Sequence, residues 1–206
     1  MGLDMYLKKG IKIPKKKGSK EFKSYEELRK INDLIANEEN EEMIELYKDY
    51  VFDCGECIHW KSLTKEIVYW RKANAIHKWF VDNVQDYNDD CGYYEVTKEK
   101  LTELRDKCVE VMSVIELEDG KVSNGYGFKK NENGELEKVE YWEDGKIVKN
   151  PNIVAQILPT QSGFFYGSTD YNQYYYEDIK RTLAELNKVL KETDFEKEYL
   201  EYTSSW

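Results

Sequence analysis

The sequence predicts a single α+β domain spanning residues 1–206, with four to five helices around one central, buried helix and a small, mostly antiparallel sheet. Two observations support this prediction. Apolar residues recur at helical spacing in several segments and alternate with polar residues in a few shorter ones, and the two kinds of segment follow each other in irregular order. Turn signals crowd into residues 120–150, which we expect to form an inserted β-meander.

The N-terminal part is predicted to contain a strand and two helices. Leu3, Met5 and Leu7 alternate with polar residues, which indicates a short strand. Ser24-Tyr25-Glu26-Glu27 is a capping box, so a helix is expected to begin there. An acidic helical segment is expected at about 41–50, and another short strand is expected at 57–60.

Residues 64–85 are predicted to form the central helix. A helical wheel places an apolar stripe on one side of it, with Trp70, Asn74 and His77 on the flank, where burial is expected. Arg71 lies in the solvated sector. Since an unpaired buried polar group costs free energy, Asn74 and His77 either fasten neighbouring loops or face a ligand. The stripe consists of Tyr69, Ala73, Ile76, Phe80 and Val84.

The C-terminal part is predicted to mix both kinds of element. A strand at 93–96 precedes a helix capped by Thr97. The meander carries three Asn-Gly or Asp-Gly pairs, typical of tight hairpin turns. Residues 158–167 are expected to be a loop that enters an apolar strand. The last helix is expected to begin at Ser168, Thr169 or Asp170, and a closing strand covers 199–206.

Composition narrows the function classes. The net charge of −10 argues against sequence-independent nucleic-acid binding and is compatible with a basic partner. The lysines from Lys8 to Lys17 lie in a Gly- and Pro-punctuated loop, which is either a phosphate contact or an ordinary solvated loop. No apolar stretch reaches the roughly 18 residues of a membrane span, and the N-terminus does not resemble a signal peptide. We therefore expect a cytosolic protein with reduced thiols and no membrane partner.

Five phrases together resemble a family of small proteins encoded by tailed phages and prophages, most of them without an assigned function. The resemblance implies a phage accessory protein in the host cytoplasm, and it supplies no catalytic residues. It does not extend to residues 8–60 or to the meander. The phrases are Met1 to Leu7, Tyr69 to Val81, Asp89 to Gly92, Leu158 to Tyr171, and Tyr202 to Trp206.

Enzyme signals are sparse. Cys54, Cys57 and His59 form the near half of a zinc site, but the remaining cysteines do not form a second pair, so we expect neither a metal nor a cofactor. His77 is a candidate general base oriented by Asp89 or Asp90, although about three helical turns separate them and contact requires the chain to fold back. Ser162 lacks the Gly-x-Ser-x-Gly context of a nucleophile.

A binding role requires fewer specialised residues than catalysis does. Arg71 and Lys72 suit a phosphate or carboxylate, Asn74 and Gln161 suit amide-like edges, and aromatic rings suit a base. We expect a pocket formed by Trp70, Arg71, Lys72, Asn74, His77, Gln161, Ser162, Tyr166 and Tyr171. Each of these residues also has a purely structural interpretation.

Three function hypotheses follow. The first is an anti-defence protein that sequesters a nucleotide-derived signal. The second is an acidic protein-binding inhibitor of a host defence complex, which docks its aromatic surface or its meander. The third is a hydrolase that uses His77. The oligomeric state stays open.

Overall fold

The computed structural model describes residues 2–36, 40–53, 61–163 and 165–206 and has an α+β fold. The expected strand at 57–60 and the zinc half-site of Cys54, Cys57 and His59 lie outside these residues. The elements are β1 (Asp4–Ile11), α1 (Tyr25–Ala36), α2 (Glu41–Leu46), η1 (Lys48–Tyr50), β2 (Phe52–Asp53), β3 (Lys61–Ser62), β4 (Thr64–Arg71), α3 (Asn74–Asn83), β5 (Tyr94–Val96), α4 (Lys98–Val114), β6 (Leu117–Lys130), β7 (Leu136–Val148), α5 (Pro151–Ile157), α6 (Gln173–Glu192) and β8 (Glu198–Ser205).

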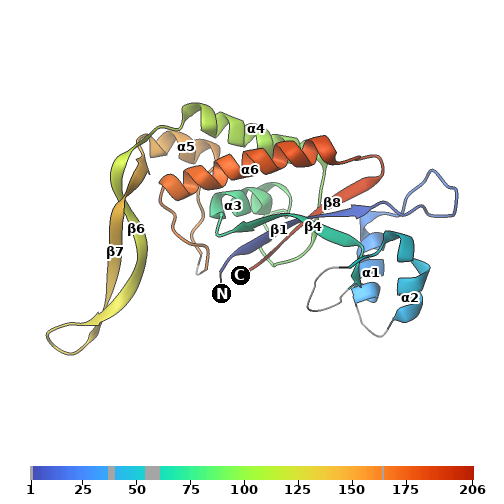
Figure 1. Ribbon diagram of the computed structural model, residues 1–206, viewed down its shortest axis with the longest axis horizontal. Helices are drawn as coiled ribbons and strands as arrows, with labels where there is room; N and C mark the ends of the chain where they lie inside the picture. Colours follow the sequence, from blue (N-terminus) through green and yellow to red (C-terminus); the bar gives the residue numbers. More distant parts are fainter. Residues whose placement is uncertain (1, 37–39, 54–60, 164) are drawn as a thin grey trace.

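A four-stranded antiparallel sheet with the order β4-β1-β8-β5 forms the middle of the molecule. The first and last strands are therefore neighbours, and the two ends of the chain lie close together (Figure 1). Strand alternation sends Leu3, Met5 and Leu7 to one face, where all three are fully buried. Helices α3, α4 and α6 cover this face and complete the main core.

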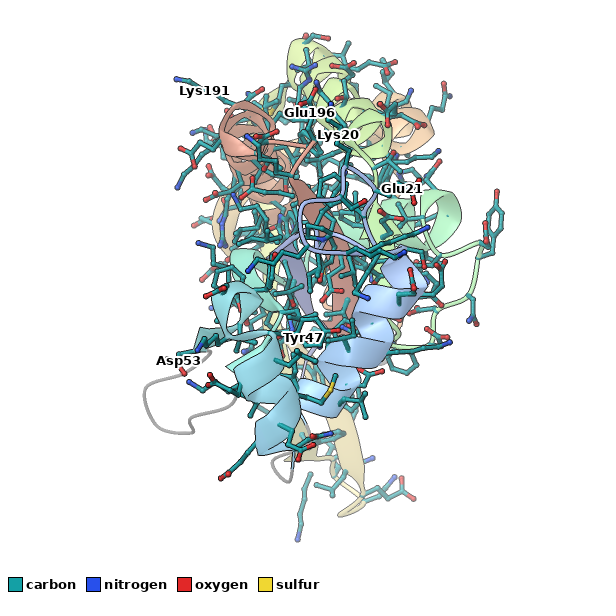
Figure 2. The ribbon with its side chains drawn as sticks, turned by 90° about the vertical axis from the view of Figure 1, so that its right-hand side faces the viewer. Lys20, Glu21, Tyr47, Asp53, Lys191 and Glu196 are labelled. Atoms are coloured by element: carbon teal, nitrogen blue, oxygen red, sulfur yellow. The ribbon has the colours of Figure 1, made fainter. Side chains whose placement is uncertain are left out.

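The opposite face of the sheet is covered by α1 at one end. Seen along the long axis, α1 and α2 lie on one side of the sheet, and α4 and α6 lie on the other (Figure 2). The predicted capping box is confirmed, because Ser24 N–H donates to Glu27 and Glu27 N–H donates to Ser24 Oγ. A second, smaller core joins α1 to the sheet through Leu28, Ile31, Ile35, Leu63 and Tyr199.

The predicted helix at 64–85 is wrong in its first half. Residues 64–71 form strand β4, which pairs along β1 from Gly10 to Asp4. Four β-branched or aromatic residues in succession, Ile67 to Trp70, favour a strand once a partner strand is available. Lys72 then adopts φ +58°, and α3 begins at Asn74. The shortened helix is buried on most sides, as the sequence indicated.

Two C-terminal expectations also need correction. No described residue between 159 and 171 is in a strand, so the described residues of this segment form a loop. Helix α6 begins after Asn172, whose Oδ1 accepts from Tyr174 N–H at 2.9 Å, and not at 168–170. By contrast, the predicted Thr97 cap of α4 is confirmed, since Thr97 Oγ1 accepts from Lys100 N–H at 3.2 Å.

Residues 117–148 form one long β-hairpin instead of a three-turn meander. The chain reverses only at 131–134, where Gly134 has φ +80°. Asn124-Gly125 is a bulge, and Asp144-Gly145 pairs within the ladder. The hairpin base is anchored to α6, since Lys146 N–H donates to Gln173 Oε1 at 2.8 Å. From this base the hairpin projects away from the body of the molecule (Figure 1).

Candidate functional site

Asn74 fastens the loop at 159–171 to the start of α3. Its amide nitrogen donates to the backbone oxygens of Tyr166, at 3.2 Å, and Ser168, at 2.8 Å. Its amide oxygen accepts from Gln161 N–H at 3.3 Å. The side chain is buried and uses both of its polar atoms internally, so its hydrogen bonds hold the loop in place.

His77 lies one turn further along α3 and is fully buried. Its Nδ1 is 2.8 Å from the Tyr202 hydroxyl, and its Nε2 is 3.1 Å from Asp89 Oδ2. The chain does fold back after α3, and this brings His77 and Asp89 into contact. Burial lowers the pKa of His77 below 6.5, while the Asp89 carboxylate partly opposes this effect. A neutral ring that donates from Nε2 and accepts at Nδ1 satisfies both neighbours.

Asp89 is the centre of this polar cluster. Besides His77, its carboxylate accepts from the Tyr166 hydroxyl at 2.5 Å and from Trp206 Nε1 at 3.0 Å. The Tyr166 ring also stands edge-on to the imidazole, with centroids 5.1 Å apart. One carboxylate therefore joins α3, the loop at 159–171 and the C-terminal strand. Sequence analysis considered Asp89 but missed Tyr202 and Trp206, whose only signal was the aromatic C-terminal phrase.

Arg71 and Lys72 lie near this cluster at the molecular surface. Arg71 ends β4, its side chain is 57% exposed, and its Nη1 is 3.6 Å from Asp4 Oδ1. Lys72 is exposed, and its side chain runs close to the backbone of Gly2 and Gly167. Both cations are therefore accessible to a ligand, although neither lies on the central helix.

The remaining expected site residues are dispersed. Trp70 is buried in the main core, where Nε1 donates to Thr182 Oγ1 at 2.9 Å. Tyr171 accepts from Thr160 N–H at 3.1 Å and packs edge-on against Tyr175. Ser162 is exposed on the loop. The structure thus brings together Asn74, His77, Gln161 and Tyr166, places Arg71 and Lys72 beside them, and separates Trp70 and Tyr171.

One atom of the cluster has no partner among the described residues. Gln161 Oε1 is buried and accepts no hydrogen bond, although the backbone N–H of the same residue is paired with Asn74. A buried unpaired carbonyl oxygen is costly, and this one lies on the loop that also carries Gly167 beside Lys72. This oxygen could accept a hydrogen bond from a ligand.

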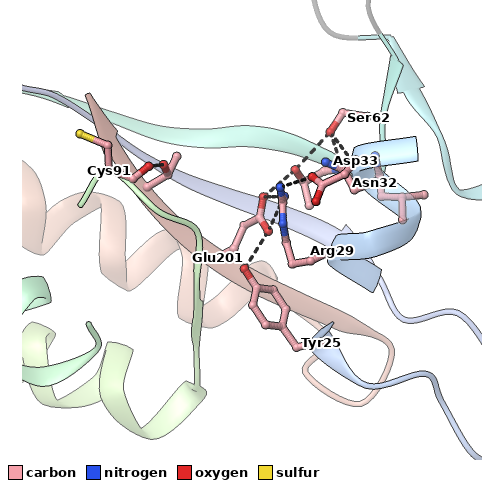
Figure 3. Close-up of polar contacts among 10 residues, drawn as sticks. Tyr25, Arg29, Asn32, Asp33, Ser62, Cys91 and Glu201 are labelled. Carbon is pink, nitrogen blue, oxygen red and sulfur yellow. Dashed lines mark hydrogen bonds and ion pairs between the residues drawn. The ribbon is translucent and has the colours of Figure 1, made fainter. Parts of the chain in front are cut away.

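A second buried cluster lies under α1, and sequence analysis did not detect it (Figure 3). Glu201 on β8 is fully buried, and its carboxylate accepts from Tyr25 Oη at 3.1 Å and from Thr64 Oγ1 at 2.9 Å. Arg29 Nη1 is 3.4 Å from both carboxylate oxygens. The Arg29 guanidinium also lies 3.9 Å from the centroid of the Tyr93 ring. These contacts fasten α1 to the sheet, and the carboxylate at their centre is fully buried.

The β6–β7 hairpin carries several of the large apolar side chains that are exposed. Strand alternation and the register Tyr126↔Glu140 and Phe128↔Lys138 place four large apolar side chains on one face, which we call the hairpin face. All four are more than half exposed. They are Tyr126 (61%), Phe128 (62%), Leu136 (69%) and Trp142 (54%).

Comparisons with protein-family models, curated proteins and solved structures find no match to this chain. Among the helices that the structure describes, none has the length and apolar character needed to cross a membrane.

Proposed function

We propose that this chain is an accessory protein that binds another protein through the hairpin face. The observation that carries the proposal is the exposure of Tyr126, Phe128, Leu136 and Trp142 on one side of a projecting hairpin. Large apolar side chains gathered at the surface of a folded domain mark an interaction site more often than isolated ones do. Tyr and Trp are also the residues most enriched at the energetic centre of protein interfaces.

The hairpin contributes little to the core beyond its base. Val122 and Val148 are buried near the body, whereas nearly all side chains toward the tip are exposed or half-exposed. A two-stranded sheet is marginally stable by itself in water, so its length is not explained by folding. The rings of Tyr126 and Phe128 pack edge-to-face with centroids 5.9 Å apart. The two side chains are therefore already ordered in the free protein for contact with a partner.

The partner's chemistry follows from the residues around this face. Residues 117–148 carry eight acidic and five basic side chains, and the whole chain has a net charge of −10. We expect an apolar groove with a basic rim on the partner, because such a rim complements the acidic hairpin and speeds association. The sequence resemblance to phage and prophage accessory proteins leads us to propose a host defence complex in the cytoplasm as the target.

A matched pair of variants tests this proposal. Phe128→Ser/Trp142→Ser removes two rings from the hairpin face, whereas Tyr141→Ser removes a ring from the opposite face of the same strand pair. We expect the first variant to weaken binding by about 100-fold or more, and the second to leave it unchanged. The readout is native mass spectrometry and size exclusion of the chain expressed in its host, with photo-crosslinking from position 128.

A supporting result is a stoichiometric heterocomplex that crosslinks at position 128 and is lost only in the double variant. A heterocomplex that survives the double variant would refute the proposal. Detection of a homodimer alone, or of a free monomer alone, would also refute it, because either result removes the heterologous partner. Equal melting temperatures of the variants are required, so that a lost complex reflects the contact and not unfolding.

Sequestration of a nucleotide-derived signal is the second candidate. It is favoured by the buried, unpaired Gln161 Oε1 and by two accessible cations, Arg71 and Lys72, the second of which lies against Gly167 of the same loop. Calorimetric titration against cyclic nucleotides and ADP-ribose derivatives tests it, with Arg71→Ala expected to weaken binding by about 1.5–3 kcal/mol. The absence of binding across the panel would end this candidate. The hydrolase hypothesis has less support, because the His77 ring is fully buried and both nitrogens have internal partners.

A further inference from the structure

The chain segregates its charge strongly near the N-terminus. Residues 8–23 contain eight lysines and one glutamate, a formal charge of +7 in a chain whose total is −10. The remaining residues therefore carry −17. Concentrating like charges in one segment costs self-repulsion, so this segment needs an explanation beyond solubility.

Residues 12–23 form a defined loop beyond the end of β1, which we call the lysine loop. Lys15 N–H donates to the Glu21 oxygen and Lys23 N–H to the Ile13 oxygen, both at 2.8 Å. Gly18 turns the chain with φ +78°, and Ile13 is buried against the α1 core. The loop thus has a fixed hairpin-like shape and an apolar anchor, which presents its lysines in a constant arrangement.

The lysines divide into those that the fold uses and those that it does not. Lys9 pairs with Glu198 at 3.0 Å, Lys12 donates to the Phe195 oxygen, and Lys15 lies 3.8 Å from Glu21. By contrast, three exposed lysines at the tip have no carboxylate partner in the described part of the chain. These are Lys16, Lys17 and Lys20.

We propose that the lysine loop binds the phosphodiester backbone of single-stranded nucleic acid. Three exposed ammonium groups on a projecting loop suit a chain of phosphates, whereas a single phosphate requires donors that converge in a cavity. Phe22, 37% exposed, lies between Lys20 and Lys23 in the sequence and supplies a ring on which an unpaired base stacks.

The negative net charge of the chain does not oppose this site. Salt screens charges over about 8 Å at physiological ionic strength, so a phosphate at the loop responds mainly to nearby side chains. The acidic hairpin lies at the opposite end of the molecule (Figure 1). Close to the loop, Asp194 pairs with Lys197 and Glu198 pairs with Lys9, which reduces the local negative charge. The inference is independent of the hairpin face and of the proposed protein partner.

Fluorescence anisotropy with a labelled oligothymidylate of 20 nucleotides tests the inference, over a range of salt concentrations. Three phosphate contacts predict a slope of log K against log[salt] of about −2 for single strands. Lys16→Gln/Lys17→Gln removes two of these contacts and should reduce the steepness by about 1.4 units. The matched control is Lys188→Gln/Lys191→Gln, which removes the same charge from exposed positions of α6 and should leave the slope unchanged.

A further variant separates stacking from charge. Phe22→Ala should weaken binding of the single strand about fivefold or more with the slope unchanged. Equal losses in the loop variant and the α6 control would refute the inference, since the effect would then reflect total charge. Failure to bind at 20 mM salt, or binding to vesicles with anionic lipid but not to the oligonucleotide, would also refute it. Melting temperatures of all variants verify that the fold is retained.

Discussion

Arg29→Met should lower the free energy of unfolding by about 3 kcal/mol, because it leaves the buried Glu201 carboxylate without its cation. The Glu201 side chain is 0% exposed and that of Arg29 is 17% exposed, so water screens their attraction weakly. The hydroxyls of Tyr25 and Thr64 would remain as donors, but they do not neutralise the charge. Breaking a buried pair costs roughly 3–5 kcal/mol, and the long 3.4 Å contacts favour the lower end.

Removing the negative charge of Glu201 should destabilise the protein less than removing Arg29. Glu201→Gln leaves Arg29 with Asp33, whose Oδ1 is 2.8 Å away, and the guanidinium keeps some access to water. We expect a loss of about 1–2 kcal/mol for Glu201→Gln, and for the double variant Arg29→Met/Glu201→Gln a loss smaller than the sum of the two single losses. A coupling energy of at least about 1 kcal/mol would show that the two side chains interact directly.

Urea unfolding at pH 7 and 25 °C, with midpoints compared at constant m-value, measures these free energies. Lys107→Met is the matched control, because Lys107 forms an exposed ion pair with Glu110 at 2.9 Å and should change stability by less than about 0.5 kcal/mol. If Arg29→Met costs no more than this control, the buried pair does not hold α1 to the sheet. If the losses of the two single variants simply add up in the double variant, the proposed contact is refuted as well.

Three further predictions concern stability. Folding lowers the pKa of His77 below 6.5, so the native state excludes a proton that the unfolded chain binds. The free energy of unfolding should therefore fall as pH drops below 6.5, and His77→Gln should make it less dependent on pH in this range. Burial raises the pKa of Asp178 to about 7. Asp178→Asn should therefore stabilise the protein by roughly 3 kcal/mol at pH 8 and by almost nothing at pH 4. An equal effect at both pH values would contradict this prediction. Asn74→Ala should lower the free energy of unfolding by about 2 kcal/mol, because three backbone groups of the loop lose their hydrogen-bond partner, whereas the exposed Asn187→Ala should lower it by less than about 0.5 kcal/mol. Similar losses in the two variants would mean that Asn74 does not hold the loop.

Elements with local signals could be predicted from the sequence. The Ser24 capping box and the Thr97 cap are read from side chains within one helical turn of the backbone groups they bind. Alternation placed Leu3, Met5 and Leu7 on one face of a strand, and aromatic, β-tolerant residues indicated the strand at the C-terminus. The α+β class follows from these local periodicities.

The candidate site depended on tertiary structure to a greater extent. Buried polar residues on α3 were predicted from the sequence, and Asp89 was one of two candidate partners of His77, but only the reversal of the chain after α3 decides for it. Tyr202 was not predicted as a partner, because it comes from a strand 125 residues away. The Glu201 cluster gave no signal, since a single glutamate in a strand is ordinarily solvated.

The sequence by itself therefore determined the class of the fold, the caps at Ser24 and Thr97, and the burial of Asn74 and His77. Tertiary structure decided whether Ile67 to Trp70 became helix or strand, because an aromatic and β-branched run satisfies both patterns until β1 supplies a partner. It also decided that the turn signals at Asn124-Gly125 and Asp144-Gly145 yield a bulge and a paired strand in one long hairpin. Local preference differs by about 1 kcal/mol between such alternatives, whereas pairing and burial contribute several, so the long-range contacts prevail.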